Sequence, residues 1–340
     1  MLNPRQAAIL GFLKKHGNAT STQIANHIMR EFPAKSSKIT IIRDIDALMA
    51  DGKIIKSGRG RATAYQAAIN IDDYFALDSD KRTLKSEYYN FDVWPKIDNL
   101  FSLAELAKLD AINAIYRKNR AAMSPATLKK ELERLTIEFS WKSSKIEGNT
   151  YTLLDTERLI KEEVEAAGKK RDEAVMILNH KKALDFVFAR PEYFQTLTLA
   201  KIEDLHKLLA DGLGVANGIR QNRVGITGTN YRPLDNAHQI REAVLTLIDK
   251  INAMGHPIAK ALAALLMISY IQPFEDGNKR AARLLGNAIL LAHDYCPLSY
   301  RGADEIEYKK GVILFYEQND FAYFKIIFMG QFEQAVKKYF

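Results

Sequence analysis

The chain of 340 residues is 47% apolar and 26% charged, has a formal net charge of +8, and is long enough for two or three globular domains. A single cysteine, Cys296, excludes a disulfide framework and a cysteine-rich zinc site, so we expect a reducing, cytoplasmic location. The longest uncharged apolar run, residues 261–271, is too short to cross a bilayer, and we expect no membrane partner.

The first 70 residues hold most of the positive charge, with eleven lysines and arginines against four acids. Apolar spacing predicts three helices there: residues 4–16, TQIANHIM after a cap at Ser21 or Thr22, and KITIIRDIDALMADG after Ser36 and Ser37. The alternation in KIIKSGRGRATAYQ then predicts a hairpin. The expected buried stripe of the third helix is Ile39, Ile42, Ile45, Leu48 and Met49.

This order of elements resembles a winged helix-turn-helix domain. The resemblance implies that the third helix enters the major groove of duplex DNA and that the hairpin lies along the backbone. The candidate DNA-binding residues are Lys38, Arg43, Arg59 and Arg61. The concentrated charge favours DNA as the partner, and a homodimer is expected of such a domain. A protein-interaction module with the same fold is the alternative.

Residues 71–123 carry no chemical motif and predict a linker followed by docking helices, one of which begins near Ser102. From residue 124 to residue 340 the apolar pattern is helical almost throughout, and only VGITGTNYRPL is typical of a strand or hairpin. The predicted fold class is therefore mainly α: a helical bundle with one β-hairpin, preceded by the small basic domain at residues 1–70.

The loop PFEDGNKR joins two apolar helices and is suited to an anion. Gly277 and Asn278 stand at a helix N-terminus, where unpaired N–H groups and the helix dipole favour a phosphate. Asp276 supplies the oxygen ligand required by a Mg²⁺ ion that bridges two phosphates. Further positive charge comes from Lys279, Arg280 and Arg283. The loop therefore predicts a phosphate-binding site with Mg²⁺.

The stretch QPFEDGNKRAAR resembles the active-site motif of Fic (Fido) proteins, His-x-Phe-x-(Asp/Glu)-Gly-Asn-(Gly/Lys)-Arg-x-x-Arg, which typically transfer AMP from ATP to a protein hydroxyl. Two other stretches agree with this family. SSKIEGNT resembles its inhibitory-helix motif, and GIRQNRVGITGTNYRPL resembles its turn and its flap hairpin, which clamps a target segment by strand addition. The resemblance covers residues 124–330 and implies a Fic-type helical bundle.

The resemblance also implies a role for each matched position. Asp276 corresponds to the Mg²⁺ ligand, and Gly277 and Asn278 to the anion hole for the α-phosphate. Arg280 and Arg283 correspond to the residues that hold the β- and γ-phosphates, beside Lys279.

The inhibitory motif is matched by Ser143, Glu147 and Gly148, with Glu147 expected to pair with Arg283 and to compete with the γ-phosphate. The residues that match the flap, and so are implied to dock a target protein, are Gly228, Thr229, Asn230 and Tyr231.

Gln272 departs from the family motif, because an amide cannot take the proton that the histidine of the family accepts. Loss of a general base costs about 10²–10⁴-fold in rate. We therefore expect a nucleotide-binding regulator with absent or impaired AMP transfer, coupled to a DNA-binding module. Two alternatives stay open: an active protein adenylyltransferase that Glu147 inhibits, and transfer of another phosphate-containing group. His180, His206 and His238 are interpreted as structural.

Overall fold

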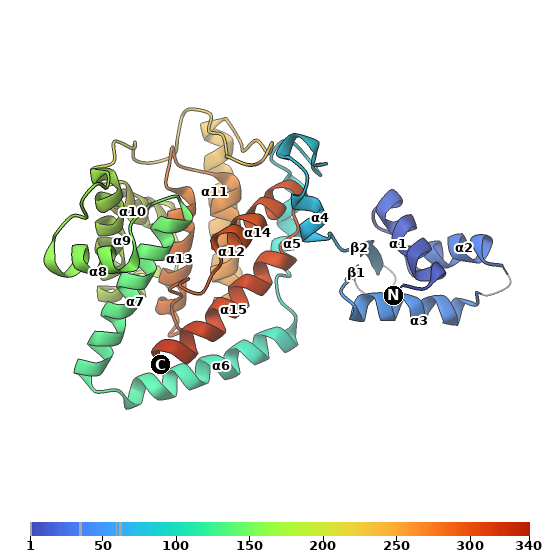
Figure 1. Cartoon of the computed structure of the whole chain (residues 1–340), viewed down its shortest axis with the longest axis horizontal. Coiled ribbons are helices and arrows are strands. Elements are labelled where there is room, and N and C mark those ends of the chain that lie inside the picture. The colour runs from blue at the N-terminus through green and yellow to red at the C-terminus, as the bar shows by residue number, and fades with distance from the viewer. Residues whose placement is uncertain (1, 34–35, 59, 61–62) are drawn as a thin grey trace. The chain divides into compact units, whose positions relative to one another are not determined.

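The structure, a computed structural model, describes residues 2–33, 36–58, 60 and 63–340 (Figure 1). The chain divides into two compact units, Met1–Asp78 and Ser79–Phe340, which are described separately. In the described parts of the chain, no helix is both long enough and apolar enough to cross a membrane.

The first unit has the predicted order of three helices and a pair of strands. β1 and β2 pair in antiparallel fashion from Ile54 opposite Ala67 to Ser57 opposite Ala64. The second helix is capped by the side chain of Thr20, which precedes the predicted caps Ser21 and Thr22. The elements are α1 (Pro4–His16), α2 (Ser21–Glu31), α3 (Lys38–Ala50), β1 (Ile54–Ser57), β2 (Ala64–Ala67) and α4 (Ile71–Phe75).

The predicted buried stripe of α3 is partly wrong. Ile45 and Leu48 are buried as expected, but Ile39 is 66% exposed and Ile42 is 40% exposed. Ile41 takes their place, because the helical period puts it on the same face as Ile45 and Leu48. Two isoleucines therefore lie on the exposed side of this helix.

The second unit is built from helices, as the sequence predicts. Figure 1 shows α12 and α13 side by side in its middle, with α11 and α14 against α12 and with α7, α9 and α10 against α13. The predicted fold class, mainly α, is confirmed. Its helices are α5 (Trp94–Ile97), α6 (Leu103–Ala122), α7 (Pro125–Ile146), α8 (Leu153–Glu162), α9 (Arg171–Ala189), α10 (Leu199–Ala210), α11 (Ala237–Ala253), α12 (Pro257–Ile271), α13 (Asn278–Ala292), α14 (Glu305–Gln318) and α15 (Ala322–Tyr339).

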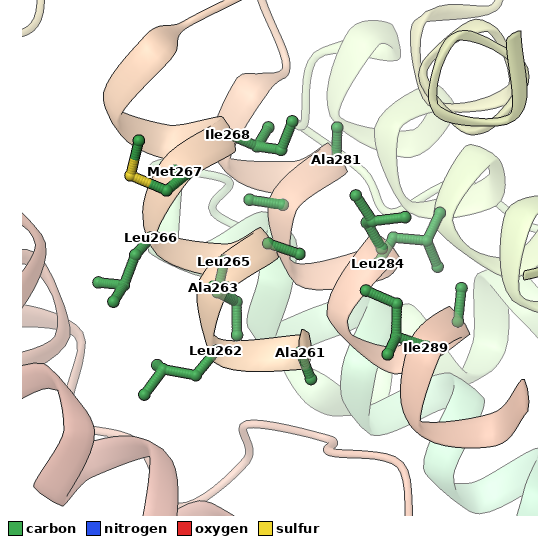
Figure 2. Close-up of a cluster of buried hydrophobic side chains, with 14 of the residues drawn as sticks. Ala261, Leu262, Ala263, Leu265, Leu266, Met267, Ile268, Ala281, Leu284 and Ile289 are labelled. Carbon is green, nitrogen blue, oxygen red and sulfur yellow. The ribbon is translucent and has the colours of Figure 1, made fainter. Parts of the chain in front are cut away.

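The pair α12–α13 forms the centre of the core. Apolar side chains of both helices gather between and around them (Figure 2), and every residue of α12 from Ala261 to Ile271 is buried. The backbones approach closely at Gly286, where an added Cβ would lie 3.3 Å from Leu265 Cδ1. The loop that joins these two helices is therefore held by a close-packed scaffold.

Residues 224–231, called the flap below, make a tight turn at Thr227 and Gly228 and have no strand pairing of their own. Among the described residues, the regular sheet is the pair β1–β2 of the first unit. The polar groups around the flap turn bind elsewhere: Thr229 Oγ1 donates to Glu317 of α14 at 2.6 Å, and Arg232 N donates to Glu87 O at 2.7 Å. In place of the predicted hairpin, the structure therefore has a loop that is held by hydrogen bonds to α14 and to Glu87.

Candidate functional site

The loop between α12 and α13 is fixed by its own side chains. Asn278, the first residue of α13, donates from Nδ2 to Phe274 O and accepts from Phe274 N at Oδ1, both at 2.8 Å. Both ends of its amide are thus bonded inside the loop, and the backbone N–H groups at the start of α13 are further donors for the predicted phosphate contact. Gly277 enters the helix with φ 79°, in the left-handed region that favours glycine.

His206 of α10 packs against this loop and donates a hydrogen bond to it. Its ring stacks on Phe274 with centroids 3.8 Å apart, and its Nε2 lies 2.8 Å from Asp276 O, to which it donates. Burial lowers the pKa of His206, which keeps the ring neutral. The sequence interpretation of a structural histidine therefore gains a specific partner, one that lies 70 residues away along the chain.

Arg280 connects the loop to the first turn of α13. Its side chain is 3% exposed, and its Nη2 donates to Asp276 Oδ2 at 2.9 Å. The Asp276 side chain is 69% exposed and borders the pocket described below. Arg280 Nη1 is buried and has no hydrogen-bond partner among the described residues, which leaves one donor of the guanidinium unused.

Arg283 is completely buried and is held by the end of α7. Its Nη2 donates to Glu147 Oε1 at 2.8 Å and to Ser143 O at 2.8 Å, and its Nε donates to Ser143 Oγ at 2.9 Å. Arg283 Nη1, like the Nη1 of Arg280, is buried without a partner in the described part of the chain. The predicted meeting of Ser143 and Glu147 with Arg283 is therefore present.

Glu147 lies between two cations. Its Oε1 accepts from Arg283, and its Oε2 lies 3.9 Å from Nζ of Lys279. Burial by itself raises the pKa of Glu147, but Arg283 and Lys279 outweigh burial and hold the pKa below its ordinary value. Gly148 follows with φ 99° and ends the helix at this point. Glu147 is therefore a carboxylate on the wall of the site.

His180 of α9 completes the support of Arg283, a role that sequence reasoning missed. Its Nδ1 lies 2.8 Å from Met176 O, which can only accept, so Nδ1 carries the proton and Nε2 accepts from Ser143 Oγ at 2.9 Å. Burial and the nearby Arg280 lower the pKa of His180 to about 3, so the ring is neutral. A chain of hydrogen bonds thus runs from Arg283 through Ser143 to His180.

Gln272 caps the C-terminus of α12 in the left-handed region, with φ 52°. Its Nε2 donates back to Ser269 O at 2.7 Å. The backbone carbonyl of Gln272 accepts from Nε of the buried Arg220 at 2.6 Å. The same guanidinium also donates to the backbone carbonyls of Asn222 and Leu234. Arg220, which the sequence prediction did not select, thus fixes Gln272 and the base of the flap together.

The loop, Glu147 and Gln272 border one pocket of about 650 Å³, whereas Arg283, His180, His206 and Arg220 lie outside its lining. It is lined by the loop from Glu275 to Arg280, by Glu147 and Gln272, by Tyr308 and other residues of α14, and by flap residues 224–228. The volume lies in the range of cofactor-sized sites, about 300–1,000 Å³. The predicted phosphate loop, the inhibitory glutamate and the flap therefore share a single cavity.

Comparison with known proteins agrees with this geometry, since residues 196–290 match the model of the Fic/DOC family. This part of the chain resembles a Fic domain, and the second unit is called the Fic domain below. The fragment of Fic-1 from C. elegans superposes with a TM-score of 0.64 at 18% identity, covering 98% of this chain and 96% of that one. A Fic domain containing signaling protein from Bacteroides thetaiotaomicron gives a TM-score of 0.57 at 20% identity, covering 67% and 94%. At these identities the structures establish the fold.

Curated relatives of the Fic domain are similar at the sequence level. The chain is 29% identical over 225 residues to the Protein adenylyltransferase Fic of Drosophila virilis, which covers 65% of this chain and 45% of that protein. It is 30% identical over 236 residues to the one of Drosophila mojavensis, covering 68% and 44%. The chain thus spans less than half the length of the curated relatives it matches.

The flap residues of the Fic domain have unequal exposure. Gly228 and Asn230 are exposed and Thr229 is half-buried. Tyr231, predicted to dock a target, is 2% exposed: its ring stacks on Tyr270 with centroids 4.6 Å apart, and its hydroxyl donates to Tyr270 O at 2.9 Å. Tyr231 is thus an anchor of the flap in the core. No backbone hydrogen bond joins residues 224–227 to another described segment.

The residues of the site fit a nucleotide with a hard metal ion. No group of three or more His, Cys, Asp or Glu side chains in the described ranges could hold a metal, and the carboxylates that the loop brings to the pocket are Glu275 and Asp276. Mg²⁺ is commonly bound by one or two carboxylates together with phosphate oxygens, which matches this donor set. The unused Nη1 atom of Arg280, a residue that lines the pocket, fits a phosphate oxygen, which accepts hydrogen bonds. Arg283 is buried and is connected to the pocket through its partner Glu147.

The predicted DNA-binding residues belong to the first unit. Lys38 and Arg43 are both exposed on α3, beside the exposed Ile39 and Ile42. Arg59 and Arg61 lie outside the described residues.

Proposed function

We propose that this protein binds ATP in its Fic domain, is inhibited by Glu147, and carries out AMP transfer weakly because Gln272 replaces a general base. The observation that carries the proposal is that Glu147, the ion-pair partner of the buried Arg283, lines the same pocket as the phosphate loop. The similarity to adenylyltransferases named Fic supports nucleotide transfer as the chemistry.

Phosphate binding depends on hydrogen-bond donors that the fold fixes before the ligand binds. The Nη1 groups of Arg280 and Arg283 are buried and unpaired within the described residues, and the N-terminus of α13 adds backbone N–H groups and the positive end of the helix dipole. Asp276 lines the pocket and would hold Mg²⁺, which would neutralise phosphate charge when bound. Because these groups are fixed before binding, ATP meets a preorganised site.

Inhibition follows from competition for one guanidinium. Glu147 already accepts from Arg283 Nη2, and a phosphate oxygen needs the same donors. Lys279 draws the carboxylate toward the loop from the other side. The carboxylate must therefore give way before Arg283 can hold the phosphate in full.

Weak transfer follows from Gln272. Its side chain lines the pocket but donates to Ser269 O, and an amide neither accepts nor releases a proton near pH 7. The attacking hydroxyl of a target protein thus lacks a base at this position, whereas the contacts for phosphate are unaffected.

Calorimetric titration with ATP and Mg²⁺, together with incubation of the protein and a lysate with ATP labelled at the α-phosphate or at the γ-phosphate, tests this function. We expect binding, reduced in Arg283→Ala, and little label on protein. Strong labelling from the α-phosphate would instead establish an active adenylyltransferase. Labelling from the γ-phosphate alone would establish transfer of another phosphate group. Absence of binding would overturn the proposal.

For the first unit we propose binding to duplex DNA, which makes the protein a regulator that joins DNA binding to nucleotide binding. The proposal is supported by the excess of positive charge in residues 1–70 and by the exposure of Lys38 and Arg43 on α3. A homodimer belongs to the same proposal, since many DNA-binding domains act on paired half-sites. A cytoplasmic location agrees with the single, buried Cys296.

A further inference from the structure

Residues 79–88 run along the flap and are called the strap below. The chain enters the strap at Ser79, directly after Asp78, the last residue of the first unit. The strap binds the end of α14 through Lys85 N, which donates to Glu317 O at 2.7 Å, and through Thr83 O, which accepts from Gln318 Nε2. Because the last carbonyls of a helix lack partners within it, the strap satisfies groups that α14 leaves open.

A buried ion pair lies where the strap meets the flap turn. The side chains of Arg82 and Glu317 are 4% and 0% exposed, and Arg82 Nη2 lies 3.4 Å from Glu317 Oε1. The same Nη2 donates to Gly228 O at the flap turn. Thr229 Oγ1 donates to Glu317 Oε1 at 2.6 Å. Arg82 therefore holds the turn directly, and it also stabilises the charge of the carboxylate that holds the next flap residue.

Two more contacts extend this attachment beyond the turn. Asn230 Nδ2 donates to Ser79 O at 3.2 Å, and Arg232 N donates to Glu87 O at 2.7 Å, which forms a parallel bridge between Tyr88 and Arg232. The chain from Gly228 to Arg232 is thus bonded to the strap along its length, whereas residues 224–227 make no backbone hydrogen bond to another described segment. We call residues 228–232 the attached limb and residues 224–227 the open limb.

We propose that the strap positions the open limb, residues 224–227, for the target segment, and that Arg82 is the positioning residue. The open limb lines the pocket and offers backbone N–H and C=O groups that no other described segment pairs, so its usefulness as a docking edge depends on a fixed place. That place is set at Gly228, where the limb joins the attached part. The inference rests on the proposed function, because the open limb is the docking edge of that same site.

Hydrogen exchange of the full chain, followed by mass spectrometry without nucleotide, tests the inference. Arg82→Met combined with Glu317→Gln removes both charges together, so no lone charge is left buried, and the new amide can still accept from Thr229. We expect exchange in peptides covering 224–232 to accelerate by about tenfold or more, with peptides of α12 and α13 unchanged. Arg82→Lys, which keeps the charge opposite Glu317, should give an intermediate rate.

The matched control is Lys85→Met, in the same segment, because Lys85 reaches α14 through its backbone N–H, which the substitution keeps. It should leave flap exchange at the wild-type rate. If the double variant fails to fold, Thr229→Val decides. It removes the hydroxyl that donates to Glu317 and accepts from Tyr231 N, so the deciding position is Arg232 N, which bonds to the strap and should also exchange faster. Wild-type flap exchange in the folded variants would overturn the inference. Because no ATP is present, this outcome is distinct from a failure of ATP binding.

Discussion

Arg280 and Arg283 stand one turn apart on α13 and have different partners. Arg280 pairs with Asp276, a carboxylate that is mostly exposed, whereas Arg283 has no exposed surface and pairs with Glu147. An exposed carboxylate moves at little cost, but the partner of a buried guanidinium must be replaced by another anion when it leaves. We therefore expect Glu147 and a phosphate to be alternative partners of Arg283, so that Arg283 controls the site.

We predict that Glu147→Gly tightens ATP binding by about tenfold or more, since a hydrogen bond to a charged group contributes about 1.5–3 kcal/mol and no longer goes to the carboxylate. Calorimetric titration with ATP and Mg²⁺ measures the change. Glu163→Gly is the matched control, because Glu163 also caps a helix, is exposed and has φ 58°, where glycine is well tolerated. Equal affinities in wild type and Glu147→Gly would remove Glu147 from regulation.

Gln272→His together with Glu147→Gly should produce Mg²⁺-dependent AMP transfer. Histidine tolerates the left-handed backbone of position 272, and Arg220 would still hold the carbonyl there. A base in place restores part of a factor of about 10²–10⁴. Transfer should rise with pH through the pKa of the new imidazole, because only the neutral ring accepts a proton.

Labelled ATP and gel analysis measure this transfer, with Gln272→Asn plus Glu147→Gly as the control that keeps an amide at position 272. Gln272→His alone should gain less, because Glu147 still holds Arg283. A folded, ATP-binding double variant that labels no protein would show that the pocket differs from a working transferase by more than one residue.

The contiguous part of the site could be predicted from the sequence, whereas its supports could not. Asp276, Arg280 and Arg283 stand within one motif, so their spacing alone brings them together. His180 and Arg220 act on partners 37 and 52 residues away, and only the packing of α7, α9 and the flap base brings them near.

The junction of α12 and α13 shows how an element sets a site. α12 ends in one left-handed residue and α13 begins after another, so the chain reverses within a few residues and the first N–H groups of α13 face the pocket. Asn278 closes this turn onto Phe274, which is fully buried. The loop therefore takes its rigidity from two of the most buried helices of the fold.

We predict that Gly277→Ala weakens ATP binding and lowers the free energy of unfolding by roughly 1–2 kcal/mol, the cost of a left-handed backbone for an L-residue. The new Cβ would lie 3.3 Å from Arg280 Nη2 and 3.5 Å from His206 Nε2, so it also displaces a phosphate-binding group. Thermal unfolding and calorimetry measure the two effects. Gly212→Ala, at φ 70° and away from the pocket, should lose stability alone. Equal ATP affinities in the two variants would contradict the prediction.

Two elements departed from their sequence patterns for physical reasons. In α3 the run of isoleucines fits more than one helical face, and contacts with α1 and α2 decide which one is buried. In the flap, the alternating pattern of VGITGTNYRPL is that of an extended chain, but the pattern does not say with what it pairs. Its partner is the strap, which is more than a hundred residues away along the chain.

The whole molecule separates charge between its units. Residues 1–70 hold eleven basic and four acidic side chains, which is nearly the entire net charge of +8, so the remainder is close to neutral. The positive charge of the first unit is expected to attract a polyanion, whereas the nearly neutral remainder of the chain exerts no such general attraction. The two activities are therefore expected to respond differently to salt, because phosphate contacts with DNA release counterions.

We predict that the full chain binds duplex DNA with an affinity that falls steeply as salt rises. Lys38→Ala with Arg43→Ala should lower both the affinity and the slope of log K against log salt, by about one for each phosphate that the protein no longer neutralises. Lys14→Ala with Lys15→Ala removes the same charge from an exposed part of α1. If α3 reads the groove, this control should weaken binding less and leave sequence preference unchanged.

Fluorescence anisotropy at several salt concentrations gives both the affinity and its salt dependence. Equal losses in the two pairs would mean that general charge, rather than α3, binds DNA. No salt-dependent binding in the wild type would favour a protein-interaction module, for which the exposed Ile39 and Ile42 offer an apolar surface on α3.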